Sequence, residues 1–375
     1  MKMKFLAWDE TLFRNPEVFD PDYLPEEYLH RELQLSRLAA NLSPATRGAA
    51  PIHTLCLGPP GTGKTTAVKL ILKELEKHQE EHQQVIPVYV NCQIINTKQQ
   101  VFTRIFEQVV GFSPPSFGTP FQKIYYKIMN KVAEEKKVLV VALDDINMLL
   151  DDRIMNEVLY AILKAHEEVE GVKVGVIGVA TDMKLSAKLD ERVGSIFHYD
   201  EVLFPLYGRE EIEDILRKRV ELGFYPGAIS EEAFQRIVDL TNESGDLRQG
   251  IYLLKVSGME AERRGSRRVE IQDVENVYGK SKIVFLRKNV GALNEFEREL
   301  LEIIYRNDDL HMGRLYELFS TKHAIGYTKF YEMVEKLENL RLIDLVYAST
   351  GRKGRTRLVI KRYDPELLLE ALKTL

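Results

Sequence analysis

The sequence predicts an α/β fold: a parallel sheet covered by helices, then a small helical domain, then a C-terminal domain of helices and a β-hairpin. Three observations predict it. Between Ile52 and Ala180, short β-rich apolar runs alternate with helical stretches. From about 206 to 285 the pattern is helical, without a comparable strand run. After about 290, three helical stretches precede two strand-like runs that flank a polar loop.

The first part of the chain supplies the sheet. Residues 1 to 50 are interrupted by prolines and contain one helical stretch, Glu26–Leu42, so they are interpreted as an N-terminal arm. The predicted strands are Ile52–Leu57, Val85–Val90, Val138–Leu143 and Val172–Ala180. The predicted helices lie near 64–80, 98–110, 120–135 and 152–169.

The rest of the chain is mostly helical. After 206 the predicted helices are Arg209–Leu222, Glu231–Leu240, Asp246–Arg264 and Ile271–Tyr278, with Gly223 and Gly265 as stop signals. Asn294 and Glu297 form a capping-box pattern that begins a helix ending at Tyr305. Helices at Met312–Phe319 and Thr328–Leu340 and strands at Leu342–Tyr347 and Arg357–Lys361 follow.

Length and composition limit the possible classes. At 375 residues the chain is longer than a single core usually grows, so we expect three domains, 1–205, 206–285 and 286–375. A net charge of −5 gives no global sign of a polyanion partner, so any basic surface must be local. Cys56 and Cys92 lie in apolar runs and form a poor disulfide framework, which fits a reducing cytoplasm. The sequence contains no apolar run long enough for a membrane span.

A phosphate-binding loop, or P-loop, follows the first predicted strand. Glycines allow backbone amides to close around phosphates, Lys64 would reach the β- and γ-phosphates, and the Thr65 hydroxyl would bind magnesium. The preceding strand, the spacing of the loop residues and the following helix all match a P-loop, so ATP or ADP is expected as the ligand. The expected nucleotide-binding residues here are Gly58, Pro59, Pro60, Gly61, Thr62, Gly63, Lys64, Thr65 and Thr66.

An acidic pair ends the third predicted strand. Asp144 is the expected Mg²⁺ ligand, together with Thr65. Asp145 is expected to polarise the attacking water. Alternatively, the two acids only cap the next helix.

These motifs resemble the AAA+ ATPases, which implies a nucleotide-binding base and a helical lid. The resemblance implies a catalytic polar residue at the end of the strand that follows the acidic pair, where this sequence has Thr181 in place of asparagine. The resemblance also implies that Arg248, in the run Gly245–Arg248, contacts the γ-phosphate from the lid. It further implies that Arg192 is an arginine finger, which would act on the nucleotide of a neighbouring subunit. Arg192 could instead be a surface salt-bridge partner. Since Asp145 stands where glutamate is usual and Thr181 where asparagine is usual, we expect a weak, switch-like ATPase that retains ADP.

The N-terminal arm narrows the resemblance. Its runs Leu12–Asn15, Asp22–Pro25 and Leu29–Leu35 are similar in their order to those of archaeal replication initiators of the origin-recognition and cell-division-cycle type. In that family this stretch packs beside the adenine, which implies nucleotide contact by Arg31. A helical insertion that contacts DNA in the family corresponds here to Phe117–Lys127.

The C-terminal pattern is that of a winged helix. Thr328 and Lys329 lie at the beginning of the third helix, where a recognition helix meets DNA bases. The hairpin tip carries cations that would bind phosphates in a salt-sensitive way. These cations are Arg352, Lys353, Arg355 and Arg357.

The family resemblance implies a DNA-binding replication initiator whose ATP or ADP state controls how it binds double-stranded origin DNA, and which helps recruit the replicative helicase alongside other initiator subunits. The expected location is the cytoplasm, at the nucleoid. A nucleotide-controlled transcription regulator or signalling ATPase with a winged helix is the alternative; a clamp-loader-like motor and a protein-binding winged helix are also open.

Overall fold

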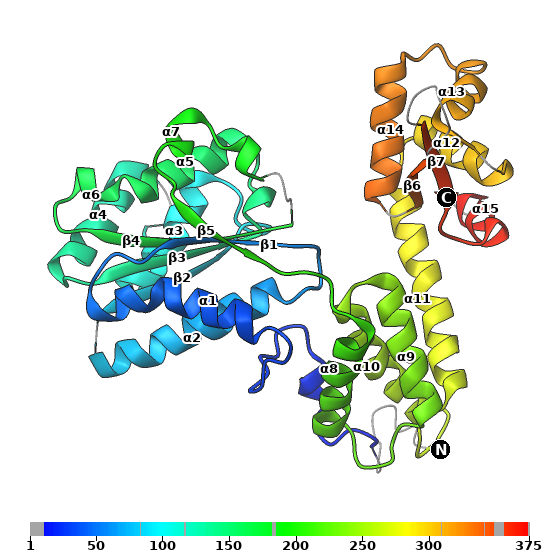
Figure 1. Cartoon of the computed structure of the whole chain (residues 1–375), viewed down its shortest axis with the longest axis horizontal. Coiled ribbons are helices and arrows are strands. Elements are labelled where there is room, and N and C mark those ends of the chain that lie inside the picture. Colours follow the sequence, from blue (N-terminus) through cyan, green and yellow to red (C-terminus); the bar gives the residue numbers. More distant parts are fainter. Residues whose placement is uncertain are drawn as a thin grey trace. The chain divides into compact units, whose positions relative to one another are not determined.

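A computed structural model describes residues 11–82, 84–115, 118–181, 185–308, 310–340, 342–348 and 356–373 (Figure 1). The chain divides into two compact units, Met1–Ile271 and Gln272–Leu375. The expected division into three domains, with boundaries after 205 and 285, stays a prediction. Among the described residues, none of the helices combines the length and the apolar character that crossing a membrane requires.

The first unit contains a five-stranded parallel sheet, which confirms the predicted α/β class. The strand order is β2-β3-β4-β1-β5. Four strands lie where they were predicted, and β5 was missed because it is an edge strand with acidic residues, in which only Val202 is buried. The strands are β1 His53–Leu57, β2 Val85–Asn91, β3 Val138–Asp144, β4 Lys173–Ala180 and β5 Tyr199–Leu203.

Helices cover both faces of this sheet. As a consequence, every residue of β3 and nearly every residue of β4 is buried. On one face α1 (Glu32–Leu42) and α2 (Lys64–His82) pack against the sheet. The other face carries α3 (Lys98–Val110), α4 (Phe121–Glu134) and α5 (Asp152–Leu163), and the short helix α6 (Ala165–Glu168) follows α5. The carboxyl ends of β1, β3 and β4 therefore meet at one edge, which positions the P-loop, the acidic pair and Thr181 together.

The predicted helix Glu26–Leu42 is wrong at its beginning, since α1 starts at Glu32. His30 has a φ of +60°, a left-handed conformation that a continuous helix does not contain, and Glu32 accepts a hydrogen bond from the His30 backbone N–H. The predicted helix 152–169 is likewise interrupted at Lys164. The residues before Glu32 form an irregular arm instead.

The N-terminal arm packs against the helices that follow the sheet. These helices are α8 (Arg209–Gly223), α9 (Glu231–Ser244) and α10 (Leu247–Arg263), as predicted to within four residues at each end. Phe13 and Phe19 pack on Phe224, with ring centroids 4.9 and 5.1 Å from it. Arg219 donates to the Val18 carbonyl at 2.7 Å. The arm is thus held by the helical lid.

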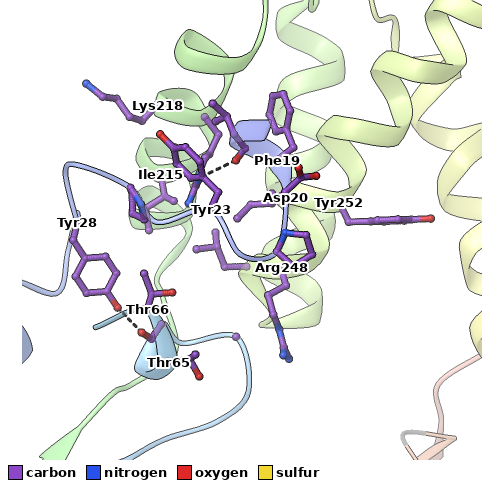
Figure 2. Close-up of a pocket in the computed structure, with 18 of the residues that line it drawn as sticks. Phe19, Asp20, Tyr23, Tyr28, Thr65, Thr66, Ile215, Lys218, Arg248 and Tyr252 are labelled. Carbon is purple, nitrogen blue, oxygen red and sulfur yellow. Dashed lines mark hydrogen bonds between the residues drawn. The ribbon is translucent and has the colours of Figure 1, made fainter. Parts of the chain in front are cut away.

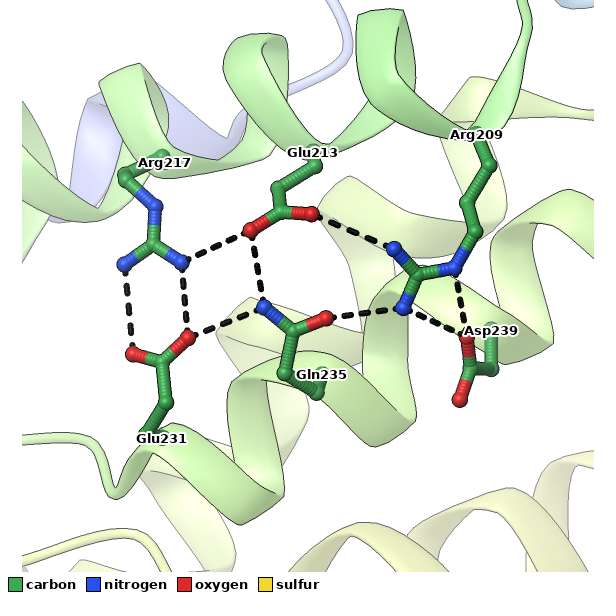
Figure 3. A network of polar contacts seen from close by, with 6 residues as sticks. All are labelled: Arg209, Glu213, Arg217, Glu231, Gln235 and Asp239. Atoms are coloured by element: carbon green, nitrogen blue, oxygen red, sulfur yellow. Dashed lines mark hydrogen bonds and ion pairs between the residues drawn. The ribbon is translucent and has the colours of Figure 1, made fainter.

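A polar network joins α8 to α9 along their exposed sides (Figure 3). The Arg217 guanidinium donates hydrogen bonds to the carboxylates of Glu213 and Glu231. The bonds to Glu231 lower the pKa of that carboxyl to about 2. The amide of Gln235 lies at the centre of the network and uses both its oxygen and its nitrogen. The network consists of Arg209, Glu213, Arg217, Glu231, Gln235 and Asp239.

The second unit has the predicted three helices and hairpin of a winged helix. It contains most of α11 (Ile271–Gly291), which passes through Gly279 and is longer than the predicted Ile271–Tyr278. The capping box of Asn294 and Glu297 is confirmed. An additional C-terminal helix was not predicted. The elements are α12 Glu295–Arg306, α13 Met312–Ser320, α14 Tyr327–Asn339, β6 Ile343–Ala348, β7 Thr356–Lys361 and α15 Pro365–Lys373.

We expect His53 to make the stability of the first unit dependent on pH. Its Nδ1 accepts a hydrogen bond from the Val176 N–H at 3.1 Å, and burial, with a smaller contribution from His198, lowers its pKa to about 4. Between pH 6.5 and 4 the unfolded chain binds a proton that the folded chain does not, so the free energy of unfolding falls as the pH falls through this window. The loss from pH 7 to pH 5 is about 1–2 kcal/mol.

Urea unfolding of wild type, His53→Asn and the exposed control His166→Gln at several pH values tests this expectation. The asparagine side chain keeps an acceptor for the Val176 N–H but does not titrate, so only His53→Asn should lose the pH dependence. If the free energy of unfolding changed equally with pH in wild type and His53→Asn, His53 would not be the source of the pH dependence.

Candidate functional site

The P-loop links β1 to α2 at the carboxyl edge of the sheet. Its glycines have left-handed or otherwise glycine-favouring backbones, with φ values of +156° at Gly58, +75° at Gly61 and +94° at Gly63. A Cβ atom at Gly58 would lie 2.2 Å from the Phe204 carbonyl oxygen, and one at Gly63 would lie 2.3 Å from the Tyr28 hydroxyl. The loop therefore requires glycine both for its conformation and for the close packing behind it.

Lys64 is the first residue of α2 and lies inside the loop, with 5% of its surface exposed. Its Nζ donates to the carbonyl oxygens of Gly58 and Pro59 at 2.7 Å each. Burial lowers the pKa of this ammonium group. A cation surrounded by loop atoms at a helix N-terminus is suited to bind anionic oxygens.

The expected metal ligands Thr65 and Asp144 are neighbours. The Thr65 hydroxyl donates to Asp144 Oδ1 at 3.1 Å, and Tyr89 donates to Oδ2 of the same carboxylate at 2.6 Å. Nowhere in the described ranges do three or more His, Cys, Asp or Glu residues gather as metal ligands. Two hard oxygen ligands still fit Mg²⁺, because this ion usually keeps water and phosphate oxygens in its coordination shell.

Asp145 lies beside Asp144 and faces the cavity. Its backbone is left-handed, with φ +52° and ψ +47°, an uncommon conformation for a residue with a side chain. Burial, and then the charge of Asp144, raise the pKa of Asp145. A raised pKa makes a carboxylate a better proton acceptor.

Two side-chain amides contact the expected catalytic residues. Gln93 donates to Asp145 Oδ2 at 2.9 Å. Asn147 donates to the Thr181 hydroxyl at 3.4 Å and accepts from the Thr181 backbone N–H at 3.3 Å. Sequence reasoning missed both amides, since no motif marks a glutamine after β2 or an asparagine two residues after an acidic pair.

The three predicted arginines have different surroundings. Arg248 lies at the N-terminus of α10, lines the cavity and pairs with Asp246 through two hydrogen bonds of 2.9 and 2.6 Å. Arg192, in α7 (Glu191–Gly194), is exposed and pairs with Asp190 at 2.8 Å. Arg31 is only 2% exposed and lies behind the P-loop, outside the cavity lining.

A cavity of about 1230 Å³ opens between the P-loop, the arm and the lid helices (Figure 2). Its lining includes Pro60 to Thr66 of the P-loop, together with Asp145, Thr181 and Arg248. Arm residues such as Tyr23 and lid residues such as Ile251 form the opposite walls. The cavity has room for a nucleoside di- or triphosphate, with the phosphates at the P-loop and the base between arm and lid.

The expected DNA-binding residues lie in the second unit. Thr328 and Lys329 are exposed in the first turn of α14, where Lys329 pairs with Glu332 at 3.0 Å. Arg357 of β7 lies 5.6 Å over the Tyr331 ring. Arg352, Lys353 and Arg355 fall outside the described residues.

Two further cations at the end of the hairpin, Lys361 of β7 and the adjacent Arg362, form ion pairs with acidic residues. Lys361 pairs with Asp308 at 2.5 Å, and Arg362 pairs with Asp344 at 2.7 Å. In the insertion between α3 and α4, Phe117 also falls outside the described residues, while Lys127 of α4 lies 5.1 Å from the exposed Phe112 ring.

The chain is similar over its whole length to known proteins. The Cdc6 AAA+ ATPase-type lid domain matches residues 213–279, and the AAA domain matches residues 50–183. The ORC1-type DNA replication protein 2 of Methanosarcina acetivorans is 44% identical over 368 residues, covering 98% of each chain. Its namesake from Methanothermobacter thermautotrophicus is 45% identical over 362 residues, covering 96% of this chain and 95% of that protein.

A solved structure extends this similarity to both compact units. The structure of the Aeropyrum pernix ORC1 protein in complex with DNA superimposes with a TM-score of 0.75, at 28% identity and with 98% of each chain covered. The similarity therefore includes the sheet, the lid helices and the winged helix.

Proposed function

Because this chain belongs to the family of ORC1-type DNA replication proteins and carries an AAA+ ATPase domain, we propose that it is a replication initiator whose bound ATP or ADP controls its binding to double-stranded origin DNA. The observation that carries the proposal is the arrangement of Lys64, Thr65, Asp145 and Arg248 around a cavity between base and lid, in a chain that also has a winged helix. Asp144 lies behind this lining and accepts a hydrogen bond from Thr65. The related Aeropyrum pernix protein, which has the same parts, has been solved in complex with DNA.

In this proposal the P-loop and Lys64 bind the phosphates, and Thr65 and Asp144 hold Mg²⁺. A bound Mg²⁺ would supply positive charge to the phosphate oxygens. Asp145 orients and deprotonates the attacking water, and the Thr181 hydroxyl donates to the γ-phosphate or the water. Arg248 approaches the γ-phosphate from the lid after exchanging its contact with Asp246, and Arg192 acts on the nucleotide of a neighbouring subunit.

We expect hydrolysis to be slow, because the Asp145 carboxylate is one methylene shorter than glutamate and the Thr181 hydroxyl has a shorter reach than an amide. Asp145→Glu combined with Thr181→Asn should raise the single-turnover rate about tenfold or more. The matched control makes the same two changes at exposed positions, Asp152→Glu and Thr321→Asn, and should leave the rate unchanged. A double variant at the site no faster than wild type, with unchanged ATP affinity, would contradict this explanation of slow turnover.

The winged helix would bind duplex DNA through the beginning of α14 and the hairpin tip. The expected partners are origin DNA, other initiator subunits and the replicative helicase, with the protein located at the nucleoid in the cytoplasm. Exposed Thr328 and Lys329 are placed to contact base edges, while Arg352, Lys353, Arg355 and Arg357 would contact phosphates.

Selection of genomic DNA fragments by the purified protein, followed by sequencing, tests the initiator function. Enrichment of a few intergenic repeats beside replication start sites supports it. Enrichment at promoters would instead favour the alternative, a nucleotide-controlled transcription regulator. Absence of any DNA binding would favour a protein-binding winged helix.

A further inference from the structure

Tyr28, Arg31 and Tyr207 form a cluster that packs against the P-loop. Arg31 and Tyr207 are buried, and the two tyrosines line the cavity. The Tyr28 hydroxyl donates to the Gly63 carbonyl at 2.7 Å, and it points toward the P-loop (Figure 2). Arg31 Nε donates to the Thr62 carbonyl at 3.2 Å, and its guanidinium lies 3.6 Å from the centre of the Tyr207 ring. Two consecutive P-loop carbonyls are thus bonded to side chains of the N-terminal arm.

Arg31 is also bonded to the segment that connects the sheet to the lid. Its Nη2 donates to the Pro205 carbonyl at 2.6 Å, and its Nη1 donates to the His30 carbonyl at 2.8 Å. The guanidinium contacts three carbonyl groups and an aromatic face while only 2% of the residue is exposed. Because Arg31 also lies outside the cavity lining, its effect on a nucleotide must act through the residues that it contacts, which are the P-loop and Tyr207.

The geometry of the peptide bond shows how such an effect arises. In a trans peptide the C=O and the next N–H point in opposite directions. Bonding the Thr62 carbonyl to Arg31 therefore directs the Gly63 N–H away from Arg31. The Gly63 carbonyl accepts from the Tyr28 hydroxyl and from the Ala67 N–H of α2, and these two bonds together direct the Lys64 N–H away from Tyr28. Both N–H groups belong to residues that line the cavity, as Tyr28 and Tyr207 of the cluster also do.

We propose that Arg31 and Tyr28 are positioning residues that aim the Gly63 and Lys64 backbone N–H groups at the β-phosphate of the bound nucleotide. The inference rests on the proposed function, since it requires that the cavity binds ADP or ATP. It also reassigns Arg31, which was expected to contact the nucleotide itself. Because Arg31 bonds the Pro205 carbonyl as well, a movement of the sheet-to-lid connection would change the same loop.

Tyr28→Phe and Arg31→Lys test this inference, with Tyr225→Phe as the matched control on an exposed lid tyrosine. Phenylalanine keeps the ring of Tyr28 and removes only the hydroxyl. Lysine keeps the charge of Arg31 but lacks the fork that bonds several carbonyls at once. The measured quantities are the dissociation rate of a fluorescent ADP chased with unlabelled ADP, the competition of ADP and AMP for the site, and thermal unfolding without nucleotide.

We expect ADP to dissociate about tenfold faster from both variants and at the wild-type rate from Tyr225→Phe. The loss of affinity should be larger for ADP than for AMP, because AMP lacks the β-phosphate. An unchanged ADP dissociation rate in both variants, or an equal loss of affinity for AMP and ADP, would overturn the inference. If Arg31→Lys does not fold, the ADP dissociation rate of Tyr28→Phe alone tests the inference. A wild-type protein that binds no nucleotide would instead overturn the proposed function.

Discussion

Lys64→Ala is expected to weaken ADP and ATP binding by about a hundredfold or more. Lys64 is the cation inside the P-loop, and its Nζ lies among loop carbonyls at the N-terminus of α2. Losing it removes charge-assisted hydrogen bonds to the phosphates, each of which contributes about 1.5–3 kcal/mol. The measurement is the dissociation constant of ADP, by calorimetry or by displacement of a fluorescent analogue.

Lys73→Ala is a suitable control, because Lys73 lies on the same helix but is exposed. It should bind nucleotide like wild type. If Lys64→Ala bound ADP within about threefold of wild type, less than the loss of one charged hydrogen bond, the cavity beside the P-loop would not be the nucleotide site. Folding of the variant is checked by its unfolding transition without nucleotide.

Replacing the four cations of the hairpin by alanine is expected to reduce DNA affinity more than removing four cations from any other exposed part of the chain. Each phosphate contact releases counterions, so removal of the contacts should flatten the plot of log affinity against log salt by about 3 to 4. At low salt the affinity should fall about 100-fold or more. The variant combines Arg352→Ala, Lys353→Ala, Arg355→Ala and Arg357→Ala.

A matched variant removes the same number of charges from exposed positions of the first unit, at Lys73, Lys77, Arg153 and Arg263. Its affinity should change much less and its salt slope should stay near that of wild type. Fluorescence anisotropy with a labelled duplex, repeated at several salt concentrations, measures both quantities. Equal losses in the two variants would mean that net charge, not the hairpin, controls the binding.

Much of the fold followed from the periodicity of the sequence. The run Val138–Leu143 is continuously apolar, and it forms a fully buried central strand. The edge strand β5 was missed because its acidic residues are satisfied by side chains distant in sequence, as when Asp200 accepts from Asn41. Helix boundaries failed where tertiary contacts decide the backbone, as at His30, whose imidazole contacts Asp214 at 3.0 Å.

The candidate site was predictable where the chemistry is encoded in a local motif. The P-loop glycines and the Thr65–Asp144 contact belong to this class. The roles of Gln93, Asn147 and Tyr28 were not predictable, since each acts by meeting a residue that only the fold brings near. Arg31 was found by resemblance, but its partners on the P-loop and at Pro205 are visible only in three dimensions.

Control of DNA binding by the bound nucleotide is tested most directly by measuring the affinity for one selected genomic fragment with ADP and with a non-hydrolysable ATP analogue. If the nucleotide controls DNA binding, the two affinities will differ several-fold, and DNA will change the ratio of the nucleotide affinities by the same factor, as linkage requires. Equal DNA affinities and equal footprints in both nucleotide states, in a protein shown to bind both nucleotides, would contradict it.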